Sequence, residues 1–252
     1  METTAELKHL LKALRLSPLL STLPERVAYA KGSKLTHLEF LELLLSDEVE
    51  RRAQGTLQRR LQSARVDHDQ VLERFDWEAK VSLDRDRLKG LIGLEWIERR
   101  ENVILTGPVG VGKTFIANAL AHAACRRGKS VLVLKAAKMF KTLYAARADN
   151  SLEKELLKLI TPSLLVIDDF GLERLSAEQA HDVYEIVSER YERGSTILTS
   201  NRHITEWVTL FDDQILANSA LDRLAHNAHQ MVVEGESYRK KKASARSFSV
   251  IG

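Results

Sequence analysis

The chain has 252 residues, of which 44% are hydrophobic and 29% charged, with a formal net charge of +3. This composition is typical of a folded protein of one or two domains, and it excludes a collagen-like, low-complexity or disordered chain. The single cysteine excludes an internal disulfide, the N-terminus lacks the apolar core of a signal peptide, and no apolar run approaches the ~20 residues that cross a bilayer, so we expect a cytoplasmic protein with no membrane partner.

Residues 1–66 are predicted to form a small all-helical N-terminal domain. Thr3 and Glu6 have the spacing of a capping box, and a helical stripe of leucines follows them. Thr36 and Glu39 form a second capping box, which opens a long helix predicted to run to Arg65. No strand-like run interrupts this part of the chain.

From residue 67 onward the pattern is that of an α/β domain, expected over residues 67–252. Five short apolar runs alternate with helical segments, at 102–107, 129–136, 163–169, 195–200 and 230–235. Strands that alternate with helices indicate βαβ units. We therefore predict a five-stranded parallel sheet flanked by helices.

A phosphate-binding loop follows the first of these strands and opens a helix. It consists of Gly107, Pro108, Val109, Gly110, Val111, Gly112, Lys113 and Thr114. Glycines let backbone N–H groups approach phosphate oxygens, and the helix N-terminus adds positive potential. Lys113 is expected to reach the β and γ phosphates, and Thr114 to supply a hydroxyl to Mg²⁺. With this spacing and setting, a chance glycine-rich turn is the weaker interpretation.

Two acids, Asp168 and Asp169, end the apolar run at 163–169. Ligands of open α/β sheets bind at the carboxyl ends of strands. This position predicts Asp168 in the Mg²⁺ shell and Asp169 as the residue that orients or deprotonates the attacking water. A solvated turn is the alternative, and the preceding phosphate loop argues against it.

Two further polar residues have two interpretations each. Asn201, after the strand at 195–200, could hold the attacking water or the γ phosphate, or it could belong to a helix N-cap. Arg223 lies on a predicted helix, where it could be an ordinary solvated residue or an arginine finger that stabilises transition-state charge.

The order of the motifs GPVGVGKT, LLVIDDFG, SERYERGSTILTSNR, EW, LDRL and GESYR resembles the IstB-like family of AAA+ ATPases. These proteins help insertion sequences to transpose and are related to the DnaC helicase loaders and, more distantly, to DnaA. The resemblance runs nearly from end to end. It implies an AAA+ P-loop NTPase core after the helical domain, with a reduced C-terminal lid, because only about 17 residues follow the last strand.

The resemblance also implies ligands, partners and roles. It implies ATP and Mg²⁺, a homo-oligomer with ATP at subunit interfaces, assembly on double-stranded DNA, and a cognate transposase as partner. Asn201 would match sensor I, Arg223 the box VII arginine that reaches a neighbour's ATP, and Arg239 the sensor II position. Phe115, directly after the phosphate loop, joins the predicted nucleotide-binding stretch.

Basic residues gather in two places. The first lies on the long helix at residues 51–65, which contain no acid, and its arginines are Arg51, Arg52, Arg59, Arg60 and Arg65. A basic face beside an apolar stripe predicts contact with duplex phosphates largely independent of sequence, against the alternative of a solvated face. The second is the tail from Arg239 to Arg246, which could bind nucleic acid or only aid solubility.

These observations favour an ATP-dependent DNA-binding regulator of a transposase. A replicative helicase loader of the DnaC type is the nearest alternative. A scaffold that binds ATP without hydrolysing it is disfavoured by Asp169, Asn201 and Arg223 together. A P-loop kinase of small molecules would leave both basic clusters without a role.

Overall fold

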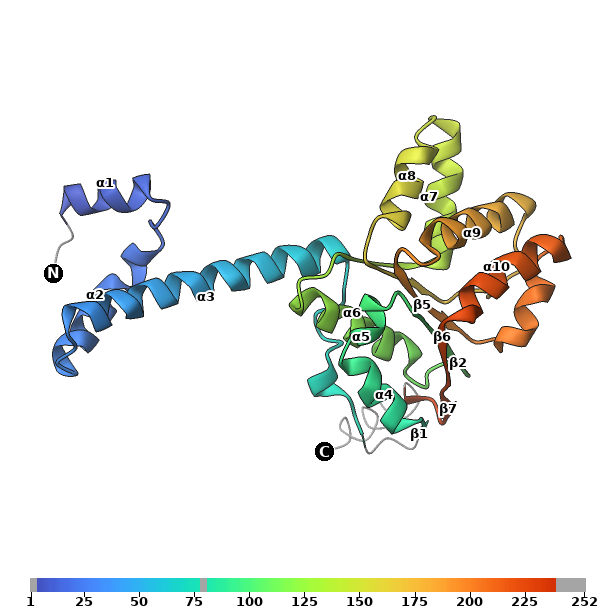
Figure 1. Ribbon diagram of the computed structural model, residues 1–252, viewed down its shortest axis with the longest axis horizontal. Helices are drawn as coiled ribbons and strands as arrows, with labels where there is room; N and C mark the ends of the chain where they lie inside the picture. The colour runs from blue at the N-terminus through green and yellow to red at the C-terminus, as the bar shows by residue number, and fades with distance from the viewer. Residues whose placement is uncertain (1–3, 78–80, 239–252) are drawn as a thin grey trace, which may run out of the picture. The chain divides into compact units, whose positions relative to one another are not determined.

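The computed structural model describes residues 4–77 and 81–238, and the chain divides into two compact units, Met1–Arg59 and Arg60–Gly252 (Figure 1). The first unit contains α1 (Ala5–Ala13), α2 (Leu19–Gly32) and most of α3 (His37–Ala64). The predicted long helix is thus confirmed, and it ends one residue before Arg65.

Local caps explain where these helices begin. The Thr36–Glu39 capping box is confirmed, because the Glu39 carboxylate accepts from the Thr36 N–H at 2.7 Å and the Glu39 N–H donates to Thr36 Oγ1 at 3.3 Å. Helix α1 is capped by Thr4 instead of the predicted Thr3, which lies outside the described residues. Each cap satisfies a backbone N–H that has no partner inside the helix.

The second unit holds the sheet and its helices. Its helical elements are η1 (Leu72–Arg74), α4 (Arg85–Ile92), α5 (Glu95–Glu98), α6 (Lys113–Arg126), α7 (Ala136–Ala148), α8 (Leu152–Ile160), α9 (Ala177–Arg190), η2 (Ile204–Leu210) and α10 (Gln214–His226). Its strands are β1 (Val81–Ser82), β2 (Asn102–Thr106), β3 (Val131–Lys135), β4 (Leu164–Asp168), β5 (Ser195–Ser200), β6 (Ala228–Val232) and β7 (Glu234–Gly235).

The main sheet has five strands in the order β3-β4-β5-β2-β6, and all neighbours are parallel. The predicted five-stranded parallel sheet is therefore confirmed. A small antiparallel pair, β1 with β7, was not predicted. Because β2 lies beside β5 and β5 beside β4, the carboxyl ends of these three strands meet at one edge.

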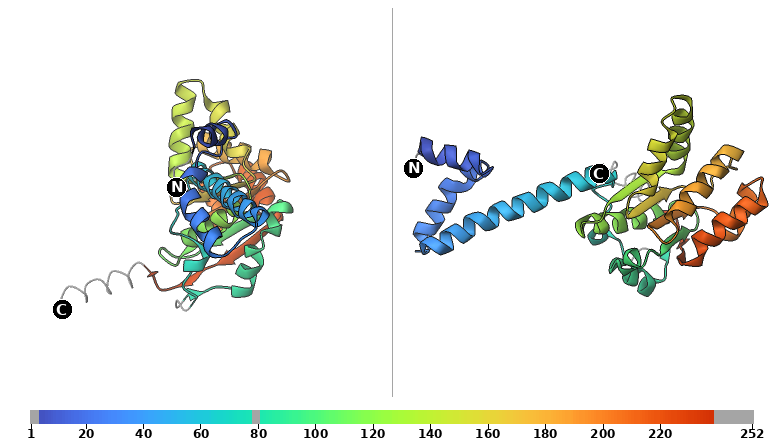
Figure 2. Two further views of the ribbon diagram at one scale, coloured as in Figure 1. Left: turned by 90° about the vertical axis from the view of Figure 1, so that its left-hand side faces the viewer. Right: turned by 45° about the horizontal axis from the view of Figure 1, so that its top comes forward.

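Helices cover both faces of the sheet (Figure 2). Helix α6 packs on one face, against β2 to β5. On the other face, side chains from α7, α8, α9, η2 and α10 form one apolar cluster with alternating sheet residues such as Leu165 and Ile167. This alternation reflects the two-residue period of a strand that is buried on both faces. None of the described helices is long and apolar enough to cross a membrane.

Candidate nucleotide site

The phosphate loop joins the carboxyl end of β2 to the start of α6, with Gly107, Gly110 and Gly112 at positive φ angles of 142°, 88° and 103°. A Cβ atom at Gly107 would lie 2.0 Å from the carbonyl oxygen of Val233. The backbone of the loop therefore needs glycine at Gly107 for two independent reasons, a left-handed conformation and a close approach.

A segment near the end of the described chain lies against this loop. The Tyr238 N–H donates to the Gly110 carbonyl oxygen at 2.9 Å, and a Cβ at Gly110 would lie 2.2 Å from Ser237 Oγ. The GESYR sequence therefore contributes its first residues to the surroundings of the loop. Its Arg239, the predicted sensor II residue, lies outside the described residues.

Lys113 connects the loop to the end of β5. Its side chain is buried, and Nζ donates to the carbonyl oxygens of Gly107 and Pro108 at 2.7 Å each and to Asn201 Oδ1 at 2.9 Å. These contacts place the ammonium group inside the curve of the loop. Phosphate oxygens would have to replace some of these acceptors, because an ammonium has three N–H donors.

Thr114 and Asp168 lie side by side at the adjoining strand end. Thr114 Oγ1 donates to Asp168 Oδ1 at 2.8 Å, and Thr199 Oγ1 donates to the same oxygen at 2.6 Å. Asp168 is only 3% exposed. A hydroxyl beside a buried carboxylate fits Mg²⁺, which prefers hard oxygen ligands.

The structure also limits how that ion would be held. Among the described residues, no group of three or more His, Cys, Asp or Glu side chains is placed to hold a metal ion. A magnesium ion at Thr114 and Asp168 would therefore take its remaining ligands from phosphate oxygens and water, as Mg²⁺ does in phosphate-loop sites.

Asp169 has an unusual backbone and an unexpected partner. Its φ is 58°, and its N–H donates to Thr199 Oγ1 at 3.0 Å. The carboxylate is partly exposed and pairs with Lys135 Nζ at 3.1 Å. Sequence reasoning missed Lys135 and the role of Thr199 as a link between the two acids, because only the strand order places the ends of β3 and β5 beside Asp168 and Asp169.

The cap interpretation of Asn201 is wrong. The cap of η2 is His203, which forms a capping box with Glu206. Asn201 instead accepts from Lys113 Nζ through its amide oxygen. Its side chain therefore belongs to the phosphate-loop cluster.

Arg223 lies away from this cluster. Its guanidinium donates to the Ser219 carbonyl oxygen at 2.9 Å and lies 5.5 Å from the ring centre of Tyr184. It lines a small cavity with Asn102 and Thr196, near the starts of β2 and β5. The phosphate loop follows the far end of β2, and five residues of strand span about 16 Å. The structure does not bring Arg223 to the phosphate loop of its own chain.

The remaining predicted loop residues differ in exposure. Val111 is buried, Val109 is 60% exposed, and the ring of Phe115 lies 5.8 Å from that of Phe75. Phe75 also contacts Trp77 edge to face, with ring centres 4.7 Å apart. Phe75 thus joins the segment before β1 to the helix that begins in the phosphate loop.

The predicted basic face is partly neutralised. Glu48 pairs with both Arg51 and Arg52 at 2.7 Å, and these hydrogen bonds, with that of Arg51 first, lower the pKa of the Glu48 carboxyl to about 2. The expectation of a basic stretch without a balancing acid is therefore wrong at Arg51 and Arg52. Glu48 lies just before residues 51–65, about one helical turn from Arg51 and Arg52.

The other three arginines differ from one another. Arg59 and Arg60 are exposed on α3, and neither forms an ion pair with another described residue. Arg65 follows α3 with a φ of 58°, so its predicted place on the basic face of the helix is wrong. The basic tail from Arg239 onward lies outside the described residues.

Comparison with known proteins agrees with this geometry. The sequence pattern of the family described as IstB-like ATP binding protein matches residues 9–246. The chain is 41% identical to a Mycobacterium tuberculosis protein named as an ATP-binding protein in an insertion sequence, over 96% of this chain and 97% of that one. It is 37% identical to the ATP-binding protein named for insertion sequence IS21 of Pseudomonas aeruginosa, over 94% and 89%.

Solved structures share the fold at low sequence identity. DnaI is 21% identical, with a TM-score of 0.57, over 65% of this chain and 90% of that one. The replication initiator DnaA bound to AMPPCP and single-stranded DNA is 20% identical, with a TM-score of 0.56, over 73% of this chain and 56% of that one. These similarities establish the AAA+ P-loop fold.

Proposed function

The chain belongs to the IstB-like ATP-binding protein family, and from this premise we propose that it hydrolyses ATP, assembles on duplex DNA and recruits and stimulates a transposase. The observation that carries the proposal is the meeting of Lys113, Asp168 and Asn201 at one edge of the sheet. These residues come from three separate parts of the sequence.

The proposed chemistry is phosphoryl transfer to water. Lys113 neutralises charge on the β and γ phosphates, and Thr114 and Asp168 provide ligands for Mg²⁺. Bound there, the ion would neutralise charge that develops on the phosphate oxygens. Asp169 accepts a proton from the attacking water, and Asn201 positions that water or the γ phosphate.

For Asp169 to act as a base, its pairing with Lys135 has to loosen or shift. The two side chains are 32% and 68% exposed, so the pair is solvated and contributes little stability. Lys135 therefore keeps the Asp169 carboxylate near the end of β4, and separating the two charges costs little free energy. We assign Lys135 as a positioning residue of the water-activating acid.

The position of Arg223 supports the proposed oligomerisation. An arginine about 16 Å from its own phosphate loop can stabilise the transition state only at another subunit's site. Assembly would therefore switch on hydrolysis, because each site is completed by a neighbour.

DNA binding is assigned to phosphate contacts from α3 and the residue that follows it. Arg59 and Arg60 are the strongest candidates, because both are exposed without an ion-pair partner in the described part of the chain. Arg65 is a further candidate, whereas Arg51 and Arg52 contribute less because Glu48 neutralises part of their charge.

The transposase is proposed as partner because the relatives are named as proteins of insertion sequences. A helicase loader of the DnaC type is the second candidate, because the motif order of the chain also resembles that group of proteins. ATP turnover with duplex and single-stranded DNA of equal length separates the two. We expect greater stimulation by duplex DNA, and binding of an integrase-type transposase in a pull-down. Stimulation by single strands only, with capture of a replicative helicase, would favour the loader.

A further inference from the structure

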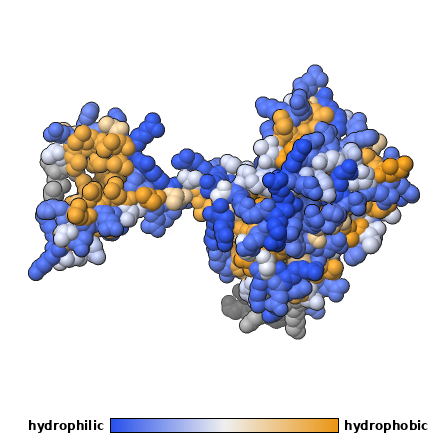
Figure 3. Space-filling view, viewed as in Figure 1, coloured by the Kyte–Doolittle hydropathy of each residue, from blue (hydrophilic) through white to orange (hydrophobic). Residues whose placement is uncertain are grey.

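An apolar stripe on α3 has no covering partner among the described residues of the first unit. We name it the α3 stripe, and its residues are Leu38, Leu41, Leu45 and Val49, which are 79%, 51%, 46% and 68% exposed. Their spacing of three and four residues places them on one face of the helix. Figure 3 shows that apolar side chains gather on the visible face of this unit. Exposed apolar patches of this kind mark interaction sites.

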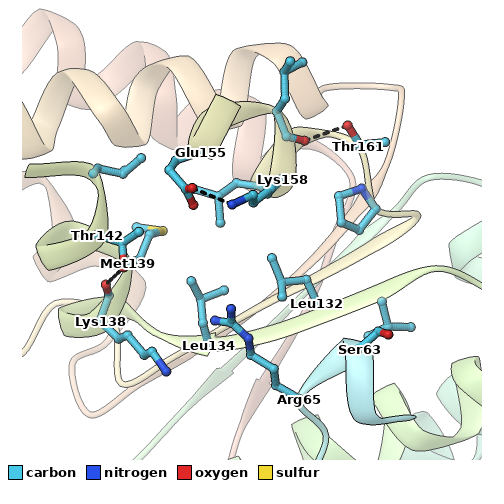
Figure 4. A pocket seen from close by; sticks show the side chains of 15 residues that line it. Ser63, Arg65, Leu132, Leu134, Lys138, Met139, Thr142, Glu155, Lys158 and Thr161 are labelled. Carbon is cyan, nitrogen blue, oxygen red and sulfur yellow. Dashed lines mark hydrogen bonds and ion pairs between the residues drawn. The ribbon is translucent and has the colours of Figure 1, made fainter. Parts of the chain in front are cut away.

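The second unit carries a groove of about 570 Å³ beside β3, the edge strand of the sheet. We name it the β3 groove. Figure 4 shows Leu132 and Leu134 of the strand pointing into it, with Met139 of α7 and Glu155 of α8 on other sides of the groove. Leu157 of α8, 54% exposed, also lines it. The groove therefore has an apolar floor that is open to solvent.

The rim of the β3 groove is basic. Arg65, Lys138 and Lys158 line it, and only Lys158 has a partner there, the Glu155 carboxylate at 2.5 Å (Figure 4). Arg65 and Lys138 form no ion pair with other described residues. Two positive charges at this rim are thus left unbalanced.

The α3 stripe has the opposite charge at its border. Glu42 and Glu50 lie beside the stripe, and both are exposed without an ion pair to another described residue. The lengths are also comparable, because the eleven steps from Leu38 to Val49 span about 16 Å of helix and the four steps along β3 span about 13 Å of strand. Length, polarity and charge are therefore compatible between two surfaces of the same chain.

We propose that the α3 stripe of one copy docks into the β3 groove of a second copy. The contact joins two different surfaces, so each docked copy still offers a free stripe or a free groove, and the contact can extend a chain of subunits. It requires neither nucleotide nor Arg223, and so it is separate from the ATP-dependent interface of the proposed function.

Four aliphatic side chains and two charge pairs form a small interface, well below the ~1,600 Å² of a standard stable one. We therefore expect association at concentrations of tens of micromolar or above, about the range of weak interfaces. Within an ATP-dependent assembly on DNA, neighbouring copies would be held close together, which raises their effective concentration.

Charge reversal tests the contact in the absence of ATP and DNA. The stripe variant is Glu42→Lys with Glu50→Lys, and the groove variant is Arg65→Glu with Lys138→Glu. Sedimentation equilibrium should show association of wild type, at least tenfold weaker association of either variant alone, and recovery when the two variants are mixed. Recovery is expected because the groove variant keeps a native stripe and the stripe variant keeps a native groove, and because the lysines of the reversed stripe also face the glutamates of the reversed groove.

A matched control changes the same charges outside the groove. Lys141→Glu with Lys154→Glu reverses two exposed lysines of α7 and α8 and should associate as wild type does. If the groove variant associates normally while the stripe variant does not, the stripe pairs with itself and the proposal is wrong. If wild type remains monomeric at a few hundred micromolar, the proposal is also wrong.

Cross-linking gives an independent result on which surfaces meet. A Leu45→Cys chain mixed with a Thr142→Cys chain should form a disulfide-linked dimer under mild oxidation. The native Cys125 will not interfere, because it is buried and burial raises the pKa of its thiol to about 11. A cross-link that forms only when both cysteines are in one chain, at any dilution, would contradict docking between copies.

Discussion

Arg223 offers the sharpest test of how subunits would cooperate. Its guanidinium lies near the starts of β2 and β5, while the phosphate loop follows the end of β2, about 16 Å further along the strand. An arginine side chain cannot span that distance. Arg223→Ala should therefore leave ATP binding unchanged and lower turnover by about 10³-fold or more, the usual effect of losing an arginine finger.

Mixing two inactive variants then separates action on a neighbour from action within one chain. In an equimolar mixture of Arg223→Ala and Asp169→Asn chains, about a quarter of randomly formed interfaces join an intact Asp169 to an intact Arg223. Turnover in a coupled phosphate-release assay should recover to about a quarter of the wild-type rate. Arg193→Ala, which removes an exposed arginine paired with Glu189, is the matched control and should turn over normally. A mixture that assembles normally yet stays inactive would refute the reasoning.

The other predictions concern single residues. Asp169→Asn should bind ATP normally but lose hydrolysis, so its DNA complex should persist in ATP. Wild-type turnover by this variant would mean that another residue activates the water. Arg59→Gln should reduce the slope of log affinity for duplex DNA against log salt by about 0.9, and Arg51→Gln by less, because Glu48 already pairs with Arg51. Equal reductions of the salt slope by the two substitutions would contradict the ranking of Arg59 above Arg51 as a phosphate contact. Burial lowers the pKa of His122 below 6.5, so the free energy of unfolding should fall as the pH drops from 7 to 5.5, because the unfolded state then binds more protons. In His122→Gln, the free energy of unfolding measured by chemical denaturation should depend less on pH over this range.

The strands and the phosphate loop could be predicted because their signals are local. Apolar runs bounded by polar residues gave all five strands of the main sheet, and the loop is defined by consecutive residues. Their alternation with helices was enough to predict parallel pairing. The pair of β1 with β7 could not be predicted, since each strand has two residues and they lie far apart in the sequence.

The contacts of the site depend on strand order, which periodicity does not encode. Lys135 meets Asp169 only because β3 lies beside β4, and Thr199 links the two acids only because β5 lies on the other side of β4. The neutralising Glu48 was missed for a different reason, since it lies just outside the basic stretch and reaches back along one helical turn.

Assembly on duplex DNA under the control of bound ATP is the central claim, and Lys113 tests it most directly. Wild type and Lys113→Ala can be compared by electron microscopy and sedimentation with duplex DNA and a slowly hydrolysed ATP analogue. Because Lys113 Nζ lies within the phosphate loop, its loss should abolish tight nucleotide binding, as measured by calorimetry. With the protein at about 1 μM, below the range expected for docking of the α3 stripe, we expect multisubunit complexes on DNA for wild type with the analogue and none for the variant. Equal assembly of both proteins on DNA at this concentration, with or without nucleotide, would contradict the claim that bound ATP controls assembly.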